Sequence, residues 1–404
     1  MKAIALFTGS ELLNGQTTNS NQTGLGRELA ACGWTLDRSE CVPDRLAAIQ
    51  AALGRALTEE AELILLCGGL GPTADDLTRA AVAQSLGLEL FTCPETLAEI
   101  RQRLSGRTHS EEHIVRQAEW IRGAVKIPNV PGLAPGLLLL SGRSRIALLP
   151  GPPREFLPML RDGLLPRLLM EFPPRLRSAV IHTCGLRESE VELRTRPLLQ
   201  EFPELLPAWC ASLGAVRVTL SLPAGREDEL AAAAARARQL FGHDALEQAS
   251  PASDCLALAR RHRLRLASAE SCTGGLISAA LTDVPGASEV FVGGIVCYAN
   301  EWKQSLLQVP QETIALHGAV SEATAQALAA GLRRFADCGV VSTGVAGPGG
   351  GSPEKPVGTV WIATIAPNGI RSRLLQLRGE RKDIRSQAVT LGLDSLRRHL
   401  LDLS

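Results

Sequence analysis

The chain has 404 residues, a length that predicts two or three domains rather than a single core. Lys and Arg together number 42, as do Asp and Glu, so the formal net charge is zero, and aromatic residues make up only 3% of the chain. Such a composition lacks the positive charge typical of a nucleic-acid-binding protein, so we do not expect direct contact with nucleic acid.

The sequence shows neither the long apolar runs of a membrane protein nor the paired cysteines of a redox site. No apolar run has the length of a membrane span, and the apolar start is too short before its polar break for a secretory signal, so we expect a cytoplasmic protein. The ten cysteines include no Cys-x-x-Cys pair, and most of them lie in or beside apolar segments. We interpret them as reduced core thiols.

The first 170 residues alternate between predicted strands and helices, which is typical of an α/β fold. Apolar runs at residues 3–7, 63–67 and 146–149 predict strands, and a helix is expected near residues 23–31. The run at residues 63–67 is continuously apolar, as in a strand that is buried on both faces of a parallel sheet.

A glycine-rich loop at residues 68–73 follows that strand directly, and Asp75 and Asp76 come next. In an open α/β sheet, ligands collect at the carboxyl ends of the strands. The aspartates could hold a divalent cation that bridges phosphates, or they could simply stabilise the first turn of a helix. The loop residues that could approach an anionic ligand are Gly68, Gly69, Gly71 and Thr73.

Residues 171–248 predict a smaller α+β unit, with strands at 179–184 and 216–222 and helices at 188–199 and 227–241. The segment contains no Gly-x-x-Gly nucleotide clamp, so a spacer or dimerisation role fits it better than RNA binding.

The stretch Ala269-Glu270-Ser271-Cys272-Thr273-Gly274-Gly275 follows a β-rich run and precedes an apolar-periodic segment, which predicts a strand, a sharp turn and a helix. A hydroxyl on such a turn lies beside unpaired N–H groups of the helix N-terminus, which can stabilise the negative charge that develops when an acyl carbon is attacked. Ser271 is therefore a candidate nucleophile, although the same turn could merely cap a helix.

Two later stretches could complete such a site. A β-like run at residues 293–297 is followed by Tyr298 and Lys303, and a desolvated lysine, alone or with a tyrosine, can deprotonate a serine. Residues 342–351 end another apolar run and place hydroxyls and backbone N–H groups on a loop that could hold an oxyanion. Alternatively, Tyr298 is a packed strand residue and Lys303 a solvated helix charge.

These blocks, in this order, resemble the CinA family. The C-terminal resemblance rests on residues 269–275, 298–303, 317–322, 343–351 and 354–360. The N-terminal resemblance rests on residues 9–15, 68–78, 117–118, 135–136 and 150–153. The family implies three domains: an open-sheet molybdopterin-binding-like (MogA-like) α/β domain at 1–170, a small KH-like α+β domain at 171–248, and an α/β CinA amidase domain at 249–404.

For the C-terminal domain the resemblance implies a nicotinamide mononucleotide deamidase, which forms nicotinate mononucleotide and ammonia without a cofactor. Ser271 is the implied nucleophile, Lys303 and Tyr298 are the activating groups, and Thr343 orients the carboxamide. The implied substrate contacts are Thr273, Gly274, Gly275, Asn300, Gly347 and Arg381, the last of which reaches the phosphate.

For the N-terminal domain the resemblance implies an ADP-ribose pyrophosphatase that depends on a divalent metal ion such as Mg or Co, with Glu11, Asp75 and Asp76 as metal ligands. Two alternatives stay open: a fold that retains a pterin or nucleotide without turnover, and an interaction protein in competence or DNA repair. A homodimer is the expected assembly.

Overall fold

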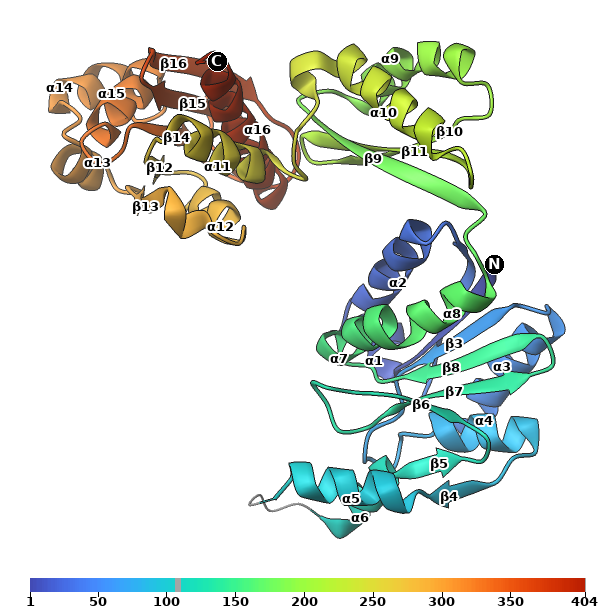
Figure 1. The fold of residues 1–404 in the computed structure, drawn as a ribbon. Coiled ribbons are helices and arrows are strands. Elements are labelled where there is room, and N and C mark those ends of the chain that lie inside the picture. Colours follow the sequence, from blue (N-terminus) through green and yellow to red (C-terminus); the bar gives the residue numbers. More distant parts are fainter. Residues whose placement is uncertain (106–109, 404) are drawn as a thin grey trace. The chain divides into compact units, whose positions relative to one another are not determined.

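The computed structural model describes residues 1–105 and 110–403, which form two compact units (Figure 1). The first unit comprises residues 1–178 and 223–227, and the second comprises residues 179–222 and the chain from residue 228 onward. Most of the expected middle and C-terminal segments therefore lie in one unit. No helix among the described residues is long and apolar enough to cross a membrane.

A six-stranded sheet forms the centre of the first unit, in the order β2-β1-β3-β8-β7-β6. The parallel strands are β2 (Thr35–Val42), β1 (Lys2–Thr8), β3 (Leu63–Cys67) and β8 (Ser144–Leu149). The antiparallel strands are β7 (Gly136–Ser141) and β6 (Val125–Ile127). The three predicted strands are confirmed, and they lie side by side in the middle of the sheet.

Helices cover both faces of this sheet, which explains the continuous apolar character of β3. One face is covered by α3 (Leu46–Thr58) and α4 (Thr78–Leu86). The other face is covered by α2 (Ser20–Ala31), α7 (Pro153–Pro158), the π-helix η1 (Met159–Leu164) and α8 (Leu165–Glu171). A two-stranded sheet of β4 (Leu90–Thr92) and β5 (Glu119–Ile121) accompanies α5 (Pro94–Arg103) and α6 (Glu111–Gln117), and α1 (Ser10–Leu13) follows β1.

A three-stranded antiparallel sheet, β10-β11-β9, forms the smaller α+β part of the chain. Its strands are β9 (Leu176–Cys184), β10 (Leu206–Ser212) and β11 (Ala215–Pro223), and the helices that pack on it are α9 (Glu188–Glu201) and α10 (Glu227–Phe241). Alternate residues of β11 are buried, so the predicted half-exposed strand is confirmed. The 3-10 turn η2 (Gly242–Asp244) leads on toward the last sheet.

The last sheet has five strands in the order β13-β12-β14-β15-β16. Its strands are β12 (Leu266–Glu270), β13 (Phe291–Val296), β14 (Cys338–Gly344), β15 (Thr359–Ala366) and β16 (Gly369–Gln376). Strands β13, β12 and β14 are parallel, whereas β15 and β16 are antiparallel to their neighbours.

Helices lie on both faces of this sheet as well (Figure 1). One face is covered by α11 (Pro251–His262), α12 (Leu276–Thr282) and α16 (Arg381–Leu401). The other face is covered by α13 (Asn300–Leu307) and α15 (Glu322–Leu332), next to α14 (Gln311–His317), and the 3-10 turn η3 (Ala287–Glu289) precedes β13.

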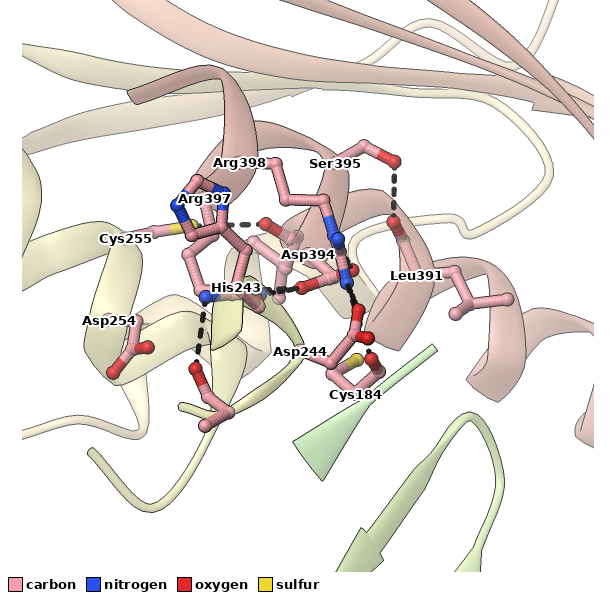
Figure 2. A network of polar contacts seen from close by, with 12 residues as sticks. Cys184, His243, Asp244, Asp254, Cys255, Leu391, Asp394, Ser395, Arg397 and Arg398 are labelled. Atoms are coloured by element: carbon pink, nitrogen blue, oxygen red, sulfur yellow. Dashed lines mark hydrogen bonds and ion pairs between the residues drawn. The ribbon is translucent and has the colours of Figure 1, made fainter. Parts of the chain in front are cut away.

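A buried ionic network joins α16 to the segment around η2 (Figure 2). Arg397 donates to Asp394 at 2.6 Å and to the His243 carbonyl at 2.5 Å, and both charged side chains are almost fully buried. Arg398 donates to Asp394 at 2.7 Å and to Asp244 at 2.6 Å. Burial favours the neutral form of Asp244, but hydrogen bonds from Arg398 and a second arginine outweigh it and lower its pKa.

We predict that Asp394→Asn lowers the free energy of unfolding by about 3 kcal/mol, because it leaves the charge of Arg397 buried without a counter-ion. Urea unfolding of the full chain measures the change. Asp402→Asn is the matched control, because its partner Arg371 is half exposed and that pair contributes little. Equal effects of the two substitutions would contradict the prediction.

Candidate active site

Ser271 lies at the carboxyl ends of three neighbouring strands. It follows β12 directly, and its N–H donates to the Ser342 carbonyl on β14 at 3.0 Å. On the other side, the N–H of Cys297 donates to the Glu270 carbonyl at 2.8 Å. The register of β13, β12 and β14 thus brings together the predicted serine block, the Tyr298 block and the Thr343 block.

The fully buried carboxylate of Glu270 organises the turn that carries Ser271. It accepts N–H groups of Gly275 at 2.9 Å, Ile277 at 3.0 Å and Ser278 at 2.8 Å, at the start of α12. It also accepts the hydroxyl of Thr273 at 2.8 Å. The charge therefore replaces the capping side chain that the helix otherwise lacks and lies where the helix dipole favours an anion.

Because the Glu270 carboxylate binds N–H groups of this turn, fewer of the predicted oxyanion donors remain free. The N–H of Gly275 is taken by Glu270 and that of Gly274 donates to the Ser271 carbonyl at 3.2 Å, so the prediction that these glycine N–H groups face substrate is wrong. The Thr273 hydroxyl is also internal, lying between Glu270 and Ser342. The backbone N–H of Thr273 has no acceptor among the described residues, but Thr273 is fully buried, so this group is not open to a substrate in this structure.

Arg385 on α16 was not anticipated from the sequence. Its guanidinium donates to the carbonyls of Cys272 at 3.1 Å and Thr273 at 2.7 Å, which clamps the Ser271 turn from the outside. Gly274 has a φ of +59°, and a Cβ there would lie 3.2 Å from the Arg385 guanidinium, so this position requires glycine. Nothing local predicts the contact, because it joins residues more than a hundred positions apart.

Lys303 is buried, not solvated: its side chain is 1% exposed. Its Nζ donates to the carbonyls of Cys297 and Tyr298, each at 2.9 Å. Burial lowers the pKa of Lys303, although the neighbouring thiols of Cys297 and Cys272 act in the opposite direction. A neutral amine has two N–H groups, which the two carbonyls satisfy, so its lone pair remains available to accept a proton.

The Tyr298 phenol does not contact Lys303; only the Tyr298 backbone does. The phenol is exposed, and its oxygen accepts from Arg381 at 3.4 Å. Arg381 also donates to the Gly347 carbonyl at 2.7 Å, so three predicted residues from three segments meet at this point. Against the larger, lowering effect of burial, the phenol acts electrostatically to raise the pKa of Lys303, and it also contacts Arg381, so the prediction that Tyr298 tunes Lys303 stays a prediction.

Three other residues of the site have well-defined surroundings. The Thr343 hydroxyl is buried and donates to the Ala319 carbonyl at 2.7 Å, so it retains only acceptor capacity for a substrate N–H. Asn300 is exposed at the first position of α13. Burial raises the pKa of the Cys272 thiol to about 11, which keeps it protonated near neutral pH and disfavours it as the nucleophile.

A separate cavity of about 610 Å³ lies in the first unit, at the carboxyl ends of β1, β3 and β8. The predicted residues that line it are Glu11, Gly68, Gly69, Gly71, Asp75 and Asp76. Thr73 is not among them, because its hydroxyl and N–H both donate to Asp76, at 2.6 and 2.7 Å. Arg103 and Glu155 also line the cavity and were missed, because neither belongs to the glycine loop.

The predicted metal ligands, Glu11, Asp75 and Asp76, belong to the first unit. Within residues 1–105 and 110–403, no three His, Cys, Asp or Glu side chains lie together in a way that could hold a metal ion. One carboxylate of the predicted set, Asp76, is already engaged by Thr73. All three predicted ligands line the same cavity, and the expectation that Glu11, Asp75 and Asp76 jointly bind a metal ion stays a prediction.

Comparisons with known proteins show which families the chain resembles. Residues 248–400 match the family described as CinA C-terminal domain, and residues 4–170 match the family described as probable molybdopterin binding domain. A relative from Moorella thermoacetica, named as a competence-damage inducible protein, is 41% identical over 419 residues and 99% of each chain. A CinA-like protein of Desulfovibrio desulfuricans is 38% identical over 100% of this chain and 97% of its own. The crystal structure of a competence/damage inducible protein from Agrobacterium tumefaciens is 43% identical, covers 37% of this chain and 96% of its own, and has a TM-score of 0.34.

We predict that Glu270→Gln destabilises the fold by about 2 kcal/mol. In the native protein both carboxylate oxygens accept backbone N–H groups, whereas the glutamine NH2 group would place a donor against one of these donors. Thermal unfolding measures the change. Glu312→Gln is the matched control, since Glu312 lies in the first turn of α14 but is exposed. A melting temperature as high as that of the control would show that the carboxylate does not hold the turn.

Proposed function

Because the chain belongs to the CinA family, we propose that its C-terminal sheet carries an amidohydrolase that converts nicotinamide mononucleotide and water into nicotinate mononucleotide and ammonia. The observation that carries the proposal is Lys303, a buried amine with two carbonyl acceptors. Lys303 lies on α13, which follows β13, and β13 pairs with β12, the strand that directly precedes Ser271. No hydrogen bond joins the Lys303 amine to the Ser271 hydroxyl within the described residues, so the proposal rests on their places at the ends of neighbouring strands. A buried lysine at such a place can act as the base for a serine without a histidine.

The chemistry follows from these groups. Neutral Lys303 accepts the proton of the Ser271 hydroxyl while Oγ forms a bond to the amide carbon. The negative charge moves onto the carbonyl oxygen of the tetrahedral intermediate, where hydrogen-bond donors stabilise it. Collapse of this intermediate breaks the C–N bond, and Lys303 returns the proton to the departing ammonia. Water then attacks the acyl ester by the same route and releases the carboxylate product.

The surroundings also suit the rest of the substrate. Arg381 lies at the start of α16 and is held by Gly347 and Tyr298, so its remaining N–H groups can bind a phosphate. The free acceptor of the Thr343 hydroxyl suits an N–H of the carboxamide. These contacts support a substrate that carries a carboxamide at one end and a phosphate at the other.

We predict that Ser271→Ala lowers ammonia release from nicotinamide mononucleotide by at least about 1,000-fold without altering the circular dichroism spectrum. Cys272→Ala is the matched control, and it should change the rate by only a few-fold because its protonated thiol takes no part. Both are measured in the presence of EDTA. Full activity of the Ser271 variant would rule out the assignment.

The pH profile tests the lysine separately. Burial lowers the pKa of Lys303 from its ordinary 10.5, and only the neutral amine accepts a proton. We therefore expect kcat/KM to rise with pH through a limb centred below pH 10.5 and to level off above it. Lys303→Arg should lose activity at every pH, because a guanidinium stays protonated. A wild-type profile without this limb would exclude Lys303 as the base.

A second function is favoured by the cavity of the first unit. Its volume and glycine-rich wall suit a nucleotide, and we propose nucleotide binding there, with ADP-ribose as the first ligand to test. ADP-ribose cleavage that requires Mg²⁺ and persists in Ser271→Ala would show a pyrophosphatase, whereas binding without cleavage would show a retained binding fold.

A further inference from the structure

A second cavity in the C-terminal sheet, of about 200 Å³, is lined by residues of α16, of the edge strand β16 and of its neighbour β15. None of the residues assigned to amide hydrolysis lines it. The polar residues that line it are Thr364, Arg371, Ser372, Arg373, Ser395, Arg398 and His399. The lining residues thus include three arginines and no aspartate or glutamate.

The three arginines differ in how far they are neutralised. Arg371 pairs with Asp402, and Arg398 pairs with Asp394 and Asp244. Arg373 is exposed on the edge strand β16, and no ion pair joins it to any residue within the described ranges. Its charge is therefore available to a ligand.

His399 provides an independent observation. Its ring is 1% exposed, and its Nδ1 lies 2.8 Å from the Thr364 hydroxyl. With Thr364 as donor, the proton of the neutral ring sits on Nε2, which is buried and has no partner in the described part of the chain. Burial, together with the charge of Arg371, lowers the pKa of His399 to about 4, so the ring is neutral at pH 7.

An unpaired buried N–H group is costly, and an acceptor that enters the cavity would remove that cost. We propose that this cavity binds a small tetrahedral oxyanion, either orthophosphate or the phosphoryl group of a phosphate monoester. Arginine guanidinium groups match the geometry of phosphate oxygens, and His399 supplies a neutral donor from the interior. The volume admits a phosphoryl group but leaves the rest of a nucleotide outside.

The test is isothermal titration of the full chain with orthophosphate at constant ionic strength. All proteins carry Arg381→Ala, which removes the phosphate contact proposed for the amidase. Against that background, Arg373→Ala should weaken binding about tenfold through loss of a charged donor. His399→Phe should weaken it by a comparable factor. Arg217→Ala, which removes an exposed strand arginine without an ion pair from β11, should leave the dissociation constant within twofold.

The outcomes separate the explanations. Equal weakening by Arg373→Ala and Arg217→Ala would overturn the proposal, because it would show attraction by overall charge alone. Unchanged binding in both Arg373→Ala and His399→Phe would overturn it as well. Repeating the titration with adenosine monophosphate distinguishes the source of the ligand. Binding of orthophosphate alone supports a free-phosphate site, and binding of both, each weakened by Arg373→Ala, supports a phosphate-monoester site.

Discussion

The buried carboxylate of Glu270 is the constraint on which the candidate active site depends. Three backbone N–H groups at the start of α12 converge on it. Because it ends β12 and caps α12 at once, it determines how sharply the chain turns between strand and helix. Ser271 stands at that turn, so the position of its hydroxyl follows from a charge that takes no part in the proposed chemistry.

Helix α16 supplies a second level of organisation. Near its start, Arg381 and Arg385 contact the loops around Ser271. Toward its end, Arg397 and Arg398 bind the segment around η2 (Figure 2). The same helix also forms one wall of the proposed oxyanion cavity. One element that is 21 residues long thus connects the candidate catalytic centre, the smaller α+β part and the second cavity, which gives a physical route by which they could influence one another.

The two candidate sites are built in different ways. In the first unit, glycines at the carboxyl ends of parallel strands leave a wide cavity that several acidic residues line. In the C-terminal sheet, the polar groups are instead buried and mutually satisfied, with Lys303 and Thr343 each held by backbone carbonyls. Buried polar groups that are fully hydrogen-bonded restrict side-chain motion, so the second arrangement is better suited to fixed catalytic geometry.

The sequence by itself determined the elements and the order of the blocks, because apolar periodicity and glycine position are local signals. It predicted β3, α10 and the strand–turn–helix around Ser271, together with the family resemblance that the comparisons bear out. Only the tertiary structure decided which polar groups meet. Two such contacts join distant segments: Arg385 with the Ser271 turn, and Tyr298 with Arg381. Such pairings depend on strand register and helix packing, which residue spacing does not encode.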